Sequence, residues 1–170
     1  MSEEAALSLA PALAPQLAVP RAAVPRADWQ VESREVPADL AALADVRVAV
    51  REVLDGWQAH EVADDVVLVA SELVANAVQH GCRPGEVVEP PTVHVGVCRG
   101  RARILLFVTD PSPSAPLRGR RDPMGVAGRG LDIVTALSTA CGWTPGRRDG
   151  RGKTVWATFR FRPLRATPST

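Results

Sequence analysis

The sequence has few cysteines, and their arrangement indicates neither a disulfide-linked nor a zinc-held scaffold. Cys82, Cys98 and Cys141 are an odd number and form no CxxC pair, which argues against both kinds of scaffold. His80, Cys82, His94 and Cys98 together could be imagined as metal ligands, but their spacing matches no common metal-binding pattern. This cysteine usage favours a reducing compartment, so we expect a cytoplasmic protein.

Long apolar runs and several familiar motifs are also missing. No stretch approaches the roughly 18 uninterrupted apolar residues that a membrane-spanning helix needs, so we expect no membrane segment. The first twenty residues begin with two glutamates and contain three prolines, which does not predict a secretion signal. The chain contains no GxxxxGK[ST], GxSxG or HExxH. A P-loop nucleotide site and these two kinds of hydrolase are therefore not indicated.

Neither sign of charge is in excess overall, yet the charges are separated along the chain. The formal net charge is +1, from 20 basic and 19 acidic residues. Residues 1–90 carry 15 acidic and 6 basic side chains, whereas residues 91–170 carry 4 acidic and 14 basic ones. The basic half indicates an anionic ligand or partner. Lys153, the one lysine beside nineteen arginines, is either an isolated surface charge or a point charge facing a phosphate.

The chain length of 170 residues predicts a single folded domain. Residues 1–27 are rich in alanine and proline, with almost no large side chains, so we expect a disordered leader before a domain of residues 28–162. Residues 163–170 are expected to be a flexible tail.

Hydrophobic periodicity predicts a mixture of helices and strands. Strands are expected at 29–36, 92–99, 102–110, 141–147 and 153–161, and helices at 38–57, 61–81 and 129–140. The strands at 92–99 and 102–110 read as a hairpin. In the first helix Leu40, Leu43, Val46, Val50, Val53 and Leu54 recur at helical spacing, and Gly56 is the expected stop. In the second helix one arc of about 100° contains Val62, Val66, Val69, Ala70, Leu73 and Ala77, and Gly81 is the expected end.

Polar residues at the margin of the second helix are candidates for chemistry. Glu72 and Asn76 are four residues apart and therefore share one face, one turn apart. A carboxylate and a carboxamide at the edge of a core need partners, and a hard cation with its waters is one such partner. It is an equally good interpretation that Glu72 is simply solvated and that Asn76 is a polar residue near the end of the helix. His80 follows one turn later within the apolar arc, where a core side chain or helix cap is commoner than a ligand.

Asp110 and a glycine pair flank a long irregular segment. Asp110 ends an apolar strand, at the sheet edge where ligands commonly bind, although a turn-initiating Asp before Pro111 is the commoner case. Gly128 and Gly130 lie where the third helix opens, and the N-terminus of a helix attracts anions. Four arginines add positive charge here: Arg118, Arg120, Arg121 and Arg129. This pattern suits phosphates, but an arginine run is usually a solvated surface.

Four segments resemble, in this order, the ATP-site boxes of the histidine-kinase-like (GHKL) ATPase superfamily. They are SELVANAVQHG, LLFVTDPSPSAP, GRGLDIVTALSTACGW and GKTVWATF. Within the superfamily the chain is most similar to bacterial anti-sigma-factor serine/threonine kinases and their stand-alone actinobacterial relatives. The resemblance covers about residues 29–161. It implies an α/β (α+β) two-layer sandwich, with helices on one face of a mixed, mostly antiparallel sheet, and ATP and Mg²⁺ as cofactors.

The resemblance also implies roles for individual residues. Glu72 corresponds to the general base, Asn76 to the Mg²⁺ ligand and Asp110 to the aspartate that recognises the adenine amino group. The segment between Asp110 and Gly128 corresponds to a lid over the nucleotide. The full nucleotide-binding set implied in this way is Asn76, His80, Asp110, Ser112, Gly128, Arg129, Gly130, Leu131, Lys153 and Thr154.

One position departs from the family pattern. The superfamily usually has glycine two residues after the adenine-reading aspartate, and Ser112 stands there in this chain. Pro111 and Ser112 restrict the backbone where it should approach the base, which predicts weaker or altered adenine binding.

Three functions follow as hypotheses. The first is a regulatory kinase that phosphorylates an anti-sigma-factor antagonist and sequesters a sigma factor. The second is a catalytically inactive, nucleotide-gated protein-interaction switch of the same fold. The third, a nucleic-acid binder that uses the basic half, lacks an aromatic-rich basic strand or a recognition-helix pattern, so we expect no direct nucleic-acid contact. Relatives commonly form homodimers, and the first strand and helix are candidate surfaces.

Overall fold

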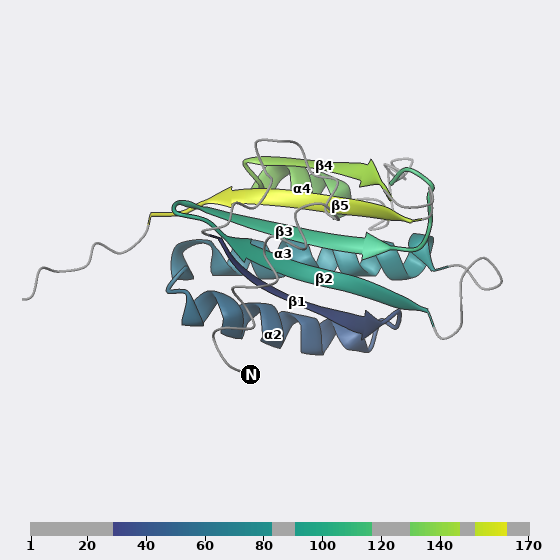
Figure 1. Cartoon of the computed structure of the whole chain (residues 1–170), viewed down its shortest axis with the longest axis horizontal. Coiled ribbons are helices and arrows are strands. Elements are labelled where there is room, and N and C mark those ends of the chain that lie inside the picture. The colour runs from purple at the N-terminus through teal and green to yellow at the C-terminus, as the bar shows by residue number, and fades with distance from the viewer. Residues whose placement is uncertain (1–28, 83–90, 117–129, 147–151, 163–170) are drawn as a thin grey trace, which may run out of the picture.

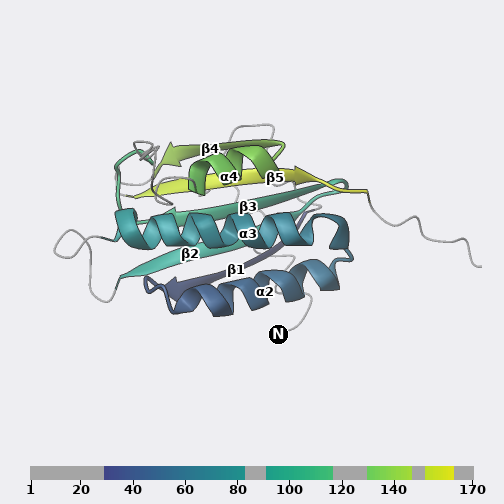
Figure 2. The same cartoon turned by 180° about the vertical axis from the view of Figure 1, so that it is seen from behind.

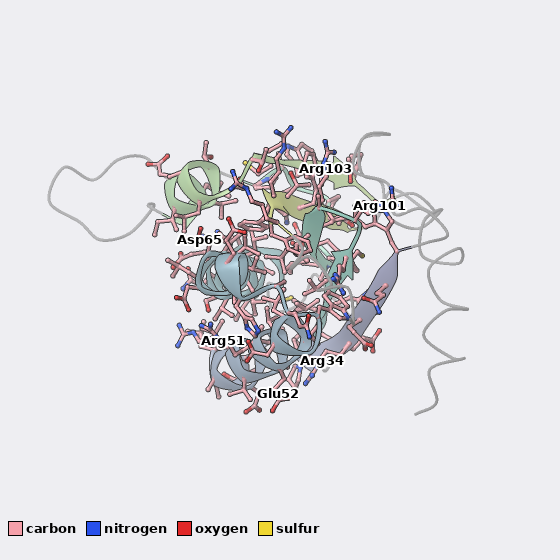
Figure 3. All side chains as sticks on the ribbon, turned by 90° about the vertical axis from the view of Figure 1, so that its left-hand side faces the viewer. Arg34, Arg51, Glu52, Asp65, Arg101 and Arg103 are labelled. Atoms are coloured by element: carbon pink, nitrogen blue, oxygen red, sulfur yellow. The ribbon has the colours of Figure 1, made fainter. Side chains whose placement is uncertain are left out.

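A five-stranded antiparallel sheet forms one layer of the fold, and three helices cover one of its faces (Figures 1 and 2). The computed structural model describes residues 29–82, 91–116, 130–146 and 152–162. Viewed along the strands, the helices lie on one side of the sheet, and Asp65 and Glu52 belong to that helical layer (Figure 3). The two-layer sandwich expected from the resemblance is confirmed. All strand pairs among the described residues are antiparallel, rather than mixed.

The strand order places two hydrophobic strands at the centre of the sheet. The strands are β1 (Gln30–Pro37), β2 (Thr92–Arg99), β3 (Arg103–Asp110), β4 (Ala140–Pro145) and β5 (Lys153–Arg160), and they lie in the order β1-β2-β3-β5-β4. The predicted hairpin of β2 and β3 is confirmed, and the N–H of Gly100 bonds to the carbonyl of Arg103 across its turn. Because β3 lies beside β5, the last residue of β3 faces the first residue of β5.

The helical layer consists of α2 (Ala42–Gly56), α3 (His60–Asn76) and α4 (Gly130–Leu137). Before α2, the Asp39 carboxylate accepts a hydrogen bond from the N–H of Ala41, an arrangement typical of the turn that leads into a helix. Leu40 therefore precedes the helix and is exposed, contrary to the predicted apolar face. The chain leaves α2 through Gln58, which has a positive φ of 55°, so this residue rather than Gly56 makes the reversal.

Helix α3 crosses the sheet and buries the predicted apolar arc completely. All six residues of that arc are buried: Val62, Val66, Val69, Ala70, Leu73 and Ala77. After Asn76 the helix widens into a π-helical turn, η1 (Ala77–Gly81), instead of ending in a simple glycine cap. This widening occurs directly beside the end of β3, with which η1 is in contact, and such turns are frequent at functional sites.

Both faces of the sheet are apolar. The main core lies between the sheet and the helices and includes Val66, Val69 and Leu106. On the opposite face a second cluster is formed by Trp29, Val31, Cys98, Leu105, Phe107 and Trp156. Strand alternation explains the division, because neighbouring residues such as Leu105 and Leu106 point to opposite faces.

The remaining expectations on organisation fall partly outside the described residues. The proposed leader, the proposed tail and the central part of the proposed lid, residues 117–129, all lie there. Within the part of the chain that the structure describes, no helix is long and apolar enough to cross a bilayer.

Candidate functional site

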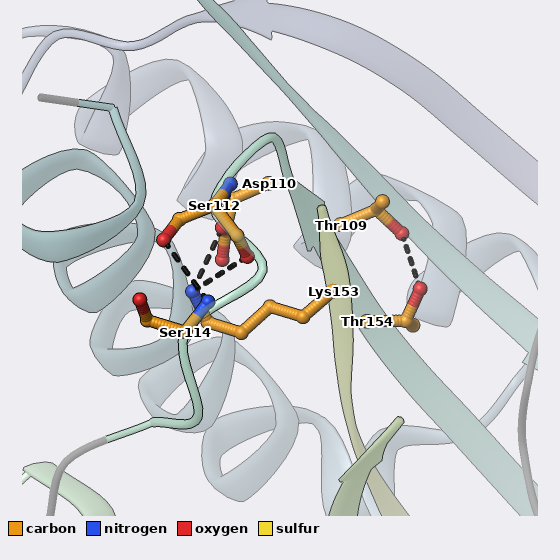
Figure 4. Close-up of polar contacts among 6 residues, drawn as sticks. All are labelled: Thr109, Asp110, Ser112, Ser114, Lys153 and Thr154. Carbon is orange, nitrogen blue, oxygen red and sulfur yellow. Dashed lines mark hydrogen bonds and ion pairs between the residues drawn. The ribbon is translucent and has the colours of Figure 1, made fainter. Parts of the chain in front are cut away.

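A buried ion pair joins the ends of β3 and β5. Lys153 Nζ lies 2.8 Å from Asp110 Oδ1 and 3.5 Å from the carbonyl oxygen of Ser112. The side chains are only 6% and 1% exposed, respectively. Asp110 Oδ1 also accepts a hydrogen bond of 3.0 Å from the N–H of Ser112 (Figure 4). Lys153 is therefore not the isolated surface charge that was one of its two interpretations, because it is the buried counter-ion of Asp110.

Each charge of this pair stabilises the other in a buried environment, where a single charge would be unfavourable. Burial raises the pKa of Asp110 above its ordinary value, while the hydrogen bond and charge of Lys153 and the N–H of Ser112 act in the opposite direction. Burial also raises the pKa of the nearby Cys82 thiol; the charge of Asp110 adds to this rise and that of Lys153 opposes it. Both charges of the pair therefore affect the pKa of the neighbouring Cys82 thiol.

The ion pair forms the base of a pocket between α3, β3, β5 and the start of α4. The space between these elements amounts to about 630 Å³ when the solvent at its open side is counted. Apolar walls come from Leu73, Ala77, Val108, Pro116, Leu131 and Val155. Polar groups come from Asn76, His80, Asp110, Ser112, Ser114 and Lys153.

At the mouth of the pocket, Glu72 and Asn76 of α3 meet the first residue of α4. A Cβ atom added to Gly130 would lie 2.7 Å from Glu72 Oε2 and 3.3 Å from Asn76 Nδ2. Only glycine therefore fits here without displacing these side chains. Asn76 Nδ2 is buried and has no hydrogen-bond partner among the described residues. A carboxylate, an unpaired carboxamide and a helix N-terminus thus converge on one point.

The structure brings most of the predicted set together. Asn76, His80, Asp110, Ser112, Leu131 and Lys153 all line the pocket. Glu72 and Gly130 lie beside it, where Glu72 and Asn76 both pack against Gly130. His80 lies in η1 and is exposed rather than buried in the apolar arc. Gly128 and Arg129 are outside the described residues.

Thr154 is the one predicted residue that the structure places elsewhere. Its hydroxyl lies 2.9 Å from that of Thr109 on the opposite face of the sheet (Figure 4). The reason is strand alternation, because Lys153 points into the pocket and its neighbour must point away. The alternative metal set of His80, Cys82, His94 and Cys98 also fails, since no group of three or more potential ligands lies together in the described ranges.

Two glycines beside Asp110 were missed as site residues. A Cβ on Gly81 would collide with the Asp110 side chain, and one on Gly152 would lie 2.6 Å from the Asp110 carbonyl oxygen. Gly152 also has a positive φ of 76°, which favours glycine strongly. In the sequence, each glycine stands at the boundary of a predicted helix or strand. Only the structure shows that each makes room for Asp110 at the end of β3.

Comparison with known proteins gives a family and a structural relative. Residues 36–159 match the family described as "Histidine kinase-like ATPase domain". No curated protein matches the sequence. The fold is similar to the crystal structure of the RsbU and RsbW domains of Rv1364c from Mycobacterium tuberculosis, with 26% identity and a TM-score of 0.53. That match covers 86% of this chain and 36% of the other one. From Val36 to Phe159, nearly the whole described fold, this chain belongs to the histidine kinase-like ATPase family.

Proposed function

We propose that this protein is a regulatory serine/threonine kinase that binds ATP with Mg²⁺, phosphorylates an anti-sigma-factor antagonist and sequesters a sigma factor. The observation that carries the proposal is the convergence of Glu72, Asn76 and the N-terminus of α4 beside a pocket with Asp110 at its base. Membership of the histidine kinase-like ATPase family and the likeness to a structure containing an RsbW domain support it.

The residues present fit a metal–nucleotide complex. The Nδ2 atom of Asn76 is buried and has no partner among the residues that the structure describes; a carboxamide can offer an oxygen to a cation or an N–H to a phosphate. The N-terminus of α4 attracts anions through its backbone N–H groups. The metal, when bound, supplies charge neutralisation to the phosphates. Asn76 would hold it, and Asp110 with the apolar walls would hold the base.

Glu72 is the candidate general base. Its carboxylate lies at the pocket mouth, against Gly130, where an incoming hydroxyl group can reach it. Phosphoryl transfer needs chiefly positioning and charge stabilisation, and a carboxylate that accepts the proton of a serine hydroxyl completes the requirement. The acceptor serine belongs to the partner protein.

Isothermal titration with ATP and Mg²⁺ tests the pocket. We expect Asn76→Ala to weaken binding by at least about tenfold, a loss seen even for outer-shell residues of metal sites. Gln79→Ala is the matched control, because Gln79 is exposed on the following turn and does not line the pocket. Equal affinities for the wild type and Asn76→Ala would show that Asn76 does not hold the metal.

A labelling assay with radioactive ATP and a candidate serine-bearing antagonist tests the transfer. We expect Glu72→Gln to lower labelling by about a hundredfold or more, because general-base catalysis contributes at least that factor. Glu52→Gln, on the exposed face of α2, should label like the wild type. Undiminished labelling by Glu72→Gln would exclude its role as base.

The second candidate function, a nucleotide-gated interaction switch without transfer, is favoured by the buried partner of Asp110 and by Ser112. Both groups occupy hydrogen-bonding positions on the carboxylate that reads the base. The two functions differ in one readout. A switch binds its partner in a nucleotide-dependent way and never labels it.

A further inference from the structure

The base of the pocket offers a hydrogen-bond donor next to an acceptor. A lone carboxylate would offer acceptors only. Here Lys153 Nζ lies 2.8 Å from Asp110 Oδ1, and both residues line the same pocket. The pair is net neutral, so a partial negative charge in the ligand is not repelled as it would be by an unpaired carboxylate.

Lys153 has hydrogen-bonding capacity left for a ligand. An ammonium group has three N–H donors. Two of them have acceptors, Asp110 Oδ1 and the more distant carbonyl oxygen of Ser112 at 3.5 Å. No further acceptor is found among the described residues, and the pocket is the space beside the group. A buried donor of this kind is stabilised when a ligand supplies an acceptor.

Purine nucleotides differ in what they present to such a base. Adenine presents a donor at position 6 and an acceptor at N1, whereas a 6-oxo purine presents an acceptor at position 6 and a donor at N1. A lone carboxylate opposite position 6 accepts a hydrogen bond from the amino group of adenine there and repels the carbonyl oxygen of a 6-oxo purine. A lysine–carboxylate pair matches either edge, because each edge also contains one donor and one acceptor.

We propose that Lys153 sets the base selectivity of this pocket, which binds 6-amino and 6-oxo purine nucleotides with similar affinity. The inference rests on the proposed nucleotide binding and adds to it which bases are accepted. Asp110 remains the acceptor, and Lys153 is the residue that removes the discrimination against a carbonyl at position 6.

Titration of the wild-type protein with ATP and with inosine triphosphate, each with Mg²⁺, is the direct test. The two ligands differ only in the hydrogen bonding at position 6 and N1. We expect dissociation constants within about threefold of each other, because each edge makes the same number of hydrogen bonds. A preference for ATP of tenfold or more would overturn the proposal.

Substitutions then assign the effect to Lys153. We expect Lys153→Met to bind inosine triphosphate at least about tenfold more weakly than ATP, since the carbonyl loses its donor and faces a carboxylate. Lys153→Gln keeps an N–H donor and should keep the wild-type ratio. Thr109→Val is the matched control, because Thr109 lies beside Asp110 on the opposite face of the sheet.

Each outcome decides something. An unchanged ratio in folded Lys153→Met would show that Lys153 does not set the selectivity. Should that variant not fold, the wild-type ratio still decides, because a lone-carboxylate site requires a strong preference for ATP. If the wild type binds neither nucleotide, the proposed function itself fails, whereas a strong preference for ATP leaves that function intact and overturns only this inference.

Discussion

At the scale of single residues, the Asp110–Lys153 pair dominates the chemistry of the pocket. A buried ion pair is weak support for stability, because the desolvation of both charges offsets their attraction. Breaking it by removing one partner is costly, since it leaves a buried charge without compensation. The pair is therefore better explained by what it does in the pocket than by a gain in stability.

A double-mutant cycle tests this view. Asp110→Asn and Lys153→Met should each lower the free energy of unfolding by about 3–5 kcal/mol, because each leaves one buried group unpaired. The double variant should lie close to the wild type, so that the two effects are strongly non-additive. Urea denaturation measures all four proteins. Additive losses would show that the two side chains do not act as a pair.

The raised pKa of Asp110 predicts a dependence of stability on pH. Since burial raises the pKa of the folded-state carboxyl above 3.8, its contribution to stability is fully present below that value. The contribution is lost as the pH rises through the raised pKa. The unfolding free energy of the wild type relative to Asp110→Asn should therefore increase when the pH is lowered from about 7 toward about 4. A difference that stays constant or falls would contradict the direction of the shift.

Several of the residues that line the pocket were named as candidates from the sequence, but their partners were not. Asp110, Asn76 and Glu72 could be found because they interrupt or border apolar patterns. The pairing of Lys153 with Asp110 could not be predicted, because it depends on β3 lying beside β5, and periodicity does not reveal which strands are neighbours.

At the scale of secondary-structure elements, the end of α3 is the feature that shapes the site. The apolar arc predicted which face of α3 is buried, since burial follows helical spacing. The π-helical turn η1 could not be predicted, because it depends on contact with the end of β3. Gly81 closes this turn directly against the Asp110 side chain.

Two glycines at helical ends allow a matched test. Gly81→Ala should lower the free energy of unfolding by about 1–3 kcal/mol, because its methyl group meets the Asp110 side chain with no space to move. Gly56→Ala, at the last residue of α2, meets nothing within 4 Å and should be neutral or stabilising by up to about 1 kcal/mol. Thermal unfolding of the two variants distinguishes them. Equal effects would mean that η1 does not pack tightly on Asp110.

At the scale of the whole molecule, the sheet is an apolar layer on both of its faces. The sequence predicted where the strands lie, but not which of their residues face the helices. The second cluster, around Phe107 and Trp156, was not anticipated, because it forms only where the outward residues of different strands meet.

Leu105 and Leu106 compare the two faces directly, since both are fully buried neighbours on β3. Leu106→Ala, on the helical side, should cost about 2–5 kcal/mol of unfolding free energy, as is typical of buried leucines. Leu105→Ala, on the other face, should cost an amount in the same range. A loss below about 0.5 kcal/mol for Leu105→Ala, as for an ordinary surface position, would show that the outer cluster contributes little to the folded state.

The pairing of Asp110 with Lys153 also has a consequence for how this architecture can vary. The two residues are 43 positions apart in the sequence, yet they face each other across adjacent strands. Between them in the sequence lie α4 and β4, and β4 pairs with β5 at the edge of the sheet. The floor of the pocket is thus held by the pairing of β3 with β5, so a difference in the length of the chain between these two strands need not change it.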